Sequence, residues 1–151
     1  MRSVLLFCLA SVLLPHFSRA DSADPKPKVE ISFDEFKGMQ DKRGRILDGS
    51  IKFYFADEQG PKADSEELSA RGSTFTSGDP ERACRLSLLT AFISFQERAK
   101  REGAKAVVDL RTYAEFSVYS KSRRRCLCRS GNRTFTTVKG RLAQMQPRVG
   151  D

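Results

Sequence analysis

The chain of 151 residues contains no tryptophan and a single histidine, His16. Catalytic triads of the Ser-His-Asp or Cys-His type need an imidazole, and zinc enzymes usually take two or three histidine ligands. Glycine-rich phosphate loops of the Walker or dinucleotide type are also missing, so nothing predicts ATP hydrolysis. We therefore expect a protein that is not an enzyme and needs no cofactor, although catalysis by carboxylates alone stays open because Asp and Glu are plentiful.

Long apolar runs are scarce, and the longest spans residues 4–14 near the start of the chain. It is too short for a membrane-spanning helix, which needs about 20 apolar residues. Small residues follow at Ser18 and Ala20, the positions that signal peptidase reads. We predict a signal peptide over residues 1–20, cut between Ala20 and Asp21, and hence a periplasmic or secreted protein. An uncleaved membrane anchor is the competing interpretation.

Cleavage would remove His16 and leave a basic chain with a net charge of +6. This charge is uneven: residues 21–81 hold 9 Lys or Arg against 14 Asp or Glu, whereas residues 82–151 hold 16 against 5. The C-terminal half is therefore where we expect an anionic partner to bind. The length fits one folded domain.

We divide the remaining chain into three parts. Residues 21–44 are predicted to be a linker with a short helical turn, in which Ser32 and Glu35 have the spacing of a capping box. Residues 45–142 are predicted to form an α+β domain. Residues 143–151 are left as a C-terminal tail.

The strongest element of the predicted domain is a helix of about 22 residues. Asp79 is a good N-cap, Pro80 suits the first helical position, and apolar residues recur at helical spacing until Gly103, a plausible cap at the other end. Alternation of apolar and polar residues predicts strands over 51–55, 106–111, 114–129 with a break near Ser120, and 134–141. Residues 57–78 lack periodicity and are predicted to be a surface loop. We expect an α+β fold: a mainly antiparallel sheet of about four strands, with the helix packed on one face.

Three cysteines remain after cleavage: Cys84, Cys126 and Cys128. An oxidising compartment favours one disulfide and one free thiol. A bond between Cys126 and Cys128 is disfavoured, because alternate residues of a strand lie about 6.5 to 7 Å apart. Cys84 can pair with Cys128, or less favourably with Cys126, and such a bridge would stabilise the fold by about 3 to 4 kcal/mol. The alternative is a redox-active or soft-metal cluster of all three sulfurs.

Basic residues are densest just before and after these strand cysteines. The candidate anion-binding residues are Lys121, Arg123, Arg124, Arg125, Arg129 and Arg133. They would attract lipid head groups, another anionic envelope component or an acidic protein, and the predicted location disfavours nucleic acid. The simpler interpretation is that the charges protect an exposed edge strand from aggregation.

Several segments resemble a group of small secreted proteobacterial proteins of unknown function, often labelled "excinuclease ATPase subunit". They are residues 47–57, Ala83-Cys84, 96–100, 103–109, 128–131 and 138–141. The step from the helix into Gly103-Ala104-Lys105-Ala106-Val107-Val108 is also distantly similar to YbjQ-type domains and to the periplasmic part of the Rcs stress lipoprotein.

This resemblance implies a disulfide between Cys84 and Cys128. The chain differs from the group in carrying Cys126 and the run from Arg123 to Arg125. The label itself is unsupported, because a DNA-repair ATPase needs a Walker loop and zinc-binding cysteines. We expect a non-enzymatic binding or envelope-associated protein; the alternative is a thiol-based redox or soft-metal-binding protein.

Overall fold

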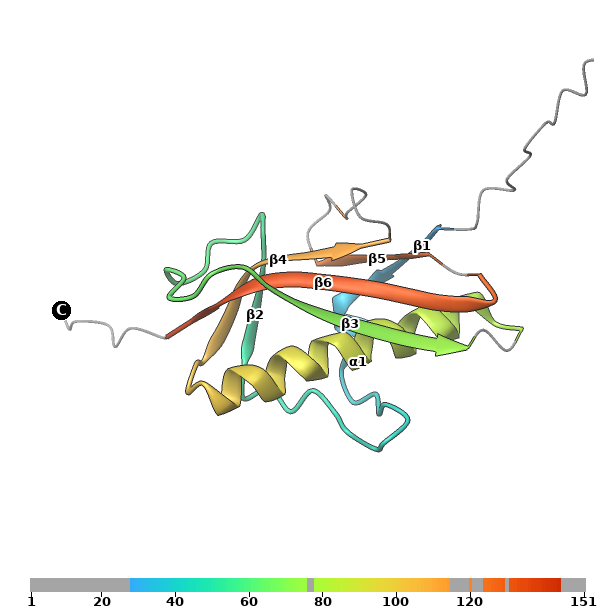
Figure 1. Ribbon diagram of the computed structural model, residues 1–151, viewed down its shortest axis with the longest axis horizontal. Coiled ribbons are helices and arrows are strands. Elements are labelled where there is room, and N and C mark those ends of the chain that lie inside the picture. Colours follow the sequence, from blue (N-terminus) through green and yellow to red (C-terminus); the bar gives the residue numbers. More distant parts are fainter. Residues whose placement is uncertain (1–27, 76–77, 115–119, 121–123, 130, 145–151) are drawn as a thin grey trace, which may run out of the picture.

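The computed structural model describes residues 28–75, 78–114, 120, 124–129 and 131–144, and shows one long helix lying against a six-stranded sheet (Figure 1). The elements are β1 (Lys28–Ser32), the 3-10 helix η1 (Phe33–Phe36), β2 (Lys52–Phe55), β3 (Leu68–Phe75), α1 (Pro80–Arg101), β4 (Ala106–Tyr113), β5 (Arg125–Arg129) and β6 (Arg133–Ala143). The predicted combination of one long helix with a sheet is confirmed.

Several predicted features lie outside the described residues. They are the signal peptide with its cleavage site at Ala20 and Asp21, the basic residues Lys121 and Arg123, and most of the C-terminal tail. Among the described residues, no helix is long and apolar enough to cross a membrane.

Strand β6 is the centre of the sheet. β3 pairs along one side of it, and β4 and β5 pair along the other. β1 extends the sheet beyond β5, and β2 extends it beyond β4. The β2–β4 pair is parallel and the other pairs are antiparallel. The sheet is therefore mainly antiparallel, as predicted, but it is mixed because of the parallel β2–β4 pair, and it has six strands where about four were predicted.

Strands β1 and β3 were not predicted. β3 occupies part of the segment expected to be a surface loop, and after Leu68 its residues that face α1 are the small ones Ala70, Gly72 and Thr74. Small residues fit there because α1 packs close to β3, and they produce no apolar alternation in the sequence. β1 lies in the segment expected to be a linker, so the sheet includes residues before position 45.

Helix α1 has the predicted ends. The side chain of Asp79 accepts a hydrogen bond from the backbone N–H of Arg82 (3.0 Å), which satisfies one free donor of the first turn. Gly103, with a φ of 70°, follows the last turn in the left-handed conformation that favours glycine. The helix buries Leu88, Phe92 and other large side chains against the sheet, and this burial is the main source of stability of the fold.

A bulge in β4 bends the sheet. The register of β4 with β6 shifts between Val108 and Arg111, and Asp109 has a φ of 54°. Before the bulge β4 pairs with β2, while after it the hydroxyl of Thr112 accepts a hydrogen bond from the backbone N–H of Leu127 in β5 (2.8 Å). β1 and β2, at the two ends of the order β1-β5-β6-β4-β2, lie near each other in the bent sheet.

The gap between these edges, which we call the seam, is closed by aromatic side chains. The ring of Phe33 in η1 lies 5.5 Å from that of Phe53 and 5.4 Å from that of Phe55, both in β2, and 4.9 Å from that of Phe92 in α1 (centroid distances). η1 begins as predicted, because the backbone N–H of Ser32 donates to the carboxylate of Glu35 (3.1 Å).

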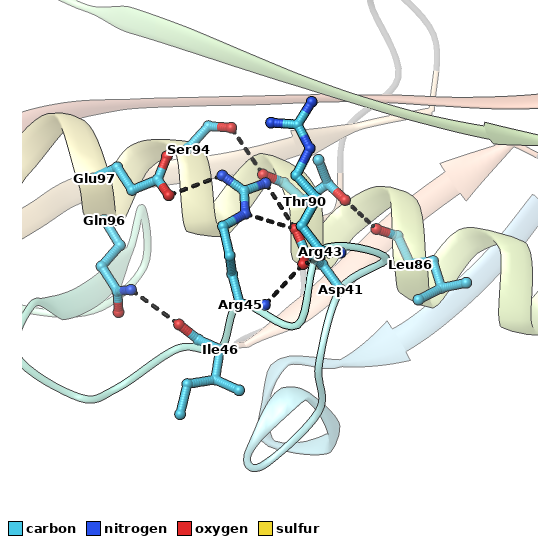
Figure 2. Close-up of polar contacts among 9 residues, drawn as sticks. All are labelled: Asp41, Arg43, Arg45, Ile46, Leu86, Thr90, Ser94, Gln96 and Glu97. Carbon is cyan, nitrogen blue, oxygen red and sulfur yellow. Dashed lines mark hydrogen bonds and ion pairs between the residues drawn. The ribbon is translucent and has the colours of Figure 1, made fainter.

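The segment between η1 and β2 is attached to α1 by polar contacts (Figure 2). Arg45 donates from Nε to the buried carboxylate of Asp41 and from Nη1 to Glu97 of the helix, each at 2.8 Å. Gln96 of the helix donates to the carbonyl of Ile46 and accepts from the backbone N–H of Asp48, each at 3.0 Å. These contacts hold a long irregular segment in one position on α1.

Candidate functional site

The outer face of the sheet, opposite α1, is the candidate functional site. No described helix packs on it (Figure 1). Successive residues of a strand point to opposite faces, so the residues of β1, β3, β4, β5 and β6 that alternate with the buried ones form this face. One end of it is covered, because Tyr54 and Ala63 pack on the buried residues Ala106, Val108 and Ala143. The rest of the face is accessible to a partner over the described part of the chain.

Positive charge dominates the outer face. Its Lys and Arg residues are Lys28, Arg71, Arg111, Arg125, Arg129, Arg133, Lys139 and Arg141. Among the described residues of these strands, the acidic side chains on this face are Glu30 and Asp109. Such an excess of one sign gives a positive potential across the face, which attracts anions.

Two exposed aromatic rings lie at one end of the outer face. Phe75 of β3 is 69% exposed and Phe135 of β6 is 57% exposed. The guanidinium carbon of Arg133 lies 5.1 Å from the ring centroid of Phe75 and 5.2 Å from that of Phe135. These cation–π contacts hold Arg133 between the two rings. The end of the face thus combines apolar and cationic groups.

Ion pairs neutralise part of the charge on the outer face. Between described residues they include Arg125 with Glu30 (3.5 Å), Arg141 with Asp109 (3.9 Å), and Lys139 with Glu67 (3.2 Å). Pairs as exposed as these contribute little and break easily. Neither Lys28 nor Arg71 has an ion-pair partner within the described residues.

The structure brings together three of the six predicted anion-binding residues. Arg125, Arg129 and Arg133 lie on the outer face, with Arg129 opposite Phe135 in the β5–β6 ladder. Arg124 does not join them. Its backbone has a φ of 52°, and its guanidinium carbon lies over the ring of Phe33 at 4.8 Å, at the seam.

The edge-protection interpretation is wrong for these three arginines. Arg125 and Arg129 belong to β5, which pairs with β1 on one side and β6 on the other. Arg133 belongs to β6, the central strand. Charges on inner strands do not shield an open edge, so another explanation is needed for their presence on this face.

Other basic residues of the outer face were not predicted as part of the site: Lys28, Arg71, Arg111, Lys139 and Arg141. The sequence of β6 contains the pattern that predicts them: Arg133, Lys139 and Arg141 are separated from the exposed Phe135 by even numbers of residues, so all four lie on the same face of the strand. A dense run of charge in the sequence does not mark such a face. In a strand, charge gathers on one face when it recurs at every second residue.

The disulfide joins Cys84 to Cys128, with their Cα atoms 5.8 Å apart, as the resemblance implied. Cys126 is the predicted free thiol and is buried, and burial raises its pKa above the ordinary value. A neutral, buried thiol is a poor nucleophile and a poor metal ligand. In the described part of the chain, no three His, Cys, Asp or Glu side chains are grouped to hold a metal ion.

The carboxyl groups with shifted pKa values do not resemble general acids. A hydrogen bond from Lys37 lowers the pKa of Asp34, and one from Lys100, aided by Ser50, lowers the pKa of Asp48 to about 2. The pKa of Asp41 is also lowered: burial raises it, but hydrogen bonds from Arg45 outweigh that effect. A general acid needs the opposite shift.

The chain was compared with protein-family models, with curated proteins and with solved structures, and none of them matches it.

Proposed function

We propose that this protein is a non-enzymatic binding module that attaches through the outer face of its sheet to an anionic lipid surface of the cell envelope. One observation carries the proposal: eight Lys and Arg side chains share this open face with two acidic ones in the described strands. The disulfide between Cys84 and Cys128 stabilises the sheet that presents them.

A membrane surface suits this face better than a small ligand does. The cationic groups are spread over five strands rather than gathered in a cleft, so they match an extended partner with many negative charges. Phe75 and Phe135 are exposed beside Arg133, and aromatic rings are favoured at the level of lipid head groups. Each Lys or Arg near an anionic membrane contributes about 1 kcal/mol of attraction.

The proposal also places the protein outside the cytoplasm. The predicted signal peptide supports this, as does the disulfide, since such bonds persist in oxidising compartments. Intact-mass analysis of the native protein tests the placement: a mature N-terminus at Asp21 agrees with it. A cytoplasmic protein that still begins at Met1 contradicts it.

Vesicle co-sedimentation tests the proposed contact. We expect binding to phosphatidylglycerol vesicles and none to phosphatidylcholine vesicles, and we expect the binding to fall as salt rises, because salt screens exposed charges. The double variant Arg71→Gln/Arg133→Gln should partition roughly 30-fold more weakly, as two contributions of about 1 kcal/mol are lost.

A matched control comes from the opposite side of the molecule. Arg82 and Arg101 are exposed residues of α1, so Arg82→Gln/Arg101→Gln removes the same charge away from the outer face. This variant should bind vesicles nearly as well as the unaltered protein. Equal losses in both variants would show that net charge, and not the outer face, governs binding. Absence of binding to phosphatidylglycerol would refute the proposal.

The redox or soft-metal alternative has less support, because the disulfide uses two of the three thiols and burial keeps the third neutral. Thiol titration of the denatured, unreduced mature protein, which lacks Cys8, distinguishes the two. One free thiol favours the binding module. Three free thiols, or stoichiometric bound metal, favour the alternative.

A further inference from the structure

A cavity of about 530 Å³ opens at the seam. Its apolar wall is formed by four side chains: Phe33 of η1, Phe53 of β2, and Leu47 and Ile51 from the segment before β2. These side chains belong to, or pack against, the main hydrophobic core. A volume of this size is typical of sites for small organic ligands.

The free edge of β2 forms one border of the cavity. Within the described residues β2 pairs with β4 alone, and the backbone N–H groups of Lys52 and Ala56 donate to that side, to the carbonyls of Lys105 (3.0 Å) and Leu110 (3.1 Å). The backbone of Phe53 therefore points away from β4, because alternate residues of a strand turn their polar groups to opposite edges. It offers a polar contact beside the apolar wall.

Charged side chains complete the lining of the cavity: Lys37, Lys52, Arg124 and Glu58. Lys37 pairs with Asp34 at 3.0 Å, and Arg124 pairs at 3.5 Å with both Asp34 and Glu58. Lys52 has no ion-pair partner among the described residues. The cavity thus presents one uncompensated ammonium group next to an apolar wall.

We infer that the seam cavity binds a small amphiphile with one carboxylate: its hydrocarbon part packs against Phe33, Ile51 and Phe53, and its head group pairs with Lys52. A head group with several charges is disfavoured, because the carboxylate of Glu58 lines the same cavity and would repel it. A wholly apolar ligand would leave the polar backbone edge of β2 unsatisfied.

The inference is tested on protein purified after expression of the full chain, with three probes that separate its parts. Decanoate has both the alkyl chain and the carboxylate, 1-decanol has the chain alone, and acetate has the charge alone. By isothermal titration calorimetry we expect saturable binding of decanoate at one site, at least tenfold weaker binding of 1-decanol, and none of acetate.

Two variants locate the site. Leu47→Trp fills the cavity from a partly buried position and should abolish decanoate binding, while circular dichroism shows that the fold is kept. Lys52→Gln should weaken decanoate binding about tenfold and leave 1-decanol unchanged. Lys42→Gln, at an exposed lysine outside this cavity, is the matched control and should change neither.

Three results would overturn the inference. Equal binding of decanoate and 1-decanol would show that the site does not recognise the carboxylate. Decanoate binding by a folded Leu47→Trp protein would show that the ligand binds outside this cavity. Binding of no probe would refute the inference as a whole. The vesicle test uses different residues, Arg71 and Arg133, so failure of either idea leaves the other standing.

Discussion

The carbonyl oxygen of Ser87 in α1 occupies the space where a side chain on Gly72 of β3 would begin. A Cβ atom on residue 72 would lie 1.8 Å from that oxygen. Backbone atoms cannot move aside as the end of a flexible side chain can, so helix and strand would have to separate. Contact between α1 and β3 at this distance therefore requires glycine.

Gly72→Ala is accordingly expected to lower the free energy of unfolding by about 3 kcal/mol, at the upper end of overpacking costs. Urea unfolding measures the loss. Ser69→Ala, an exposed position on the same strand, should change stability by less than about 0.5 kcal/mol. If both variants lose the same amount, the close approach is not the cause.

Removal of the disulfide should destabilise the protein strongly. Cys84 and Cys128 are 44 residues apart in sequence, and closing a loop of that length stabilises the folded state by about 4 kcal/mol. We expect a Cys84→Ala/Cys128→Ala protein to unfold at a much lower urea concentration than the native protein. Adding dithiothreitol should shift the native protein and leave the double variant unchanged. A shift of the double variant would point to a different bridge.

Stability should also fall in alkali because of Cys126. Burial holds the pKa of this thiol above its ordinary value of 9.0, so above about pH 9 the unfolded chain loses the proton while the folded chain keeps it. The contribution is thus complete below that pH and is lost as the pH rises, by up to about 1.4 kcal/mol per pH unit. The difference between native and Cys126→Ala unfolding profiles from pH 8 to 10.5 isolates it; parallel profiles would contradict it.

Arg45 should matter more through Asp41 than through Glu97. The Asp41 side chain is 3% exposed, whereas that of Glu97 is 44% exposed. Arg45→Met leaves a buried carboxylate without its charged partner, at a cost of about 2 kcal/mol, although two backbone N–H groups still bind it. Glu97→Gln should cost less than about 1 kcal/mol. Thermal unfolding of both variants measures the difference, and a larger loss from Glu97→Gln would reverse this ranking.

The helix and two of its neighbours could be predicted from local chemistry. Asp79, Pro80 and Gly103 mark the ends of α1, and Ser32 with Glu35 marks η1, because caps act within a few residues of sequence. The alternation before Asp57 likewise predicted β2. In each case the physical cause lies inside the segment itself.

The missed elements depend on contacts that are distant in sequence. In β3, residue 72 must be glycine because Ser87 of the helix lies so near. A glycine adds nothing to the alternation of apolar and polar residues by which a strand is predicted from sequence. The bend of the sheet at Asp109 and the parallel pairing of β2 with β4 depend on which strands lie on either side. The outer face escaped prediction for the same reason, since Arg71 and Arg133 come to lie on one face only after β3 pairs with β6.

The central strand of the sheet is also its last in the chain. β3, β4 and β5 all pair with β6, which ends at Ala143, so none of them can complete its ladder until the C-terminal residues have left the ribosome. The helix and the β2–β4 pair precede β6 in sequence, so they do not have to wait for it. The order of strands therefore delays completion of the sheet until synthesis of the described chain is nearly finished.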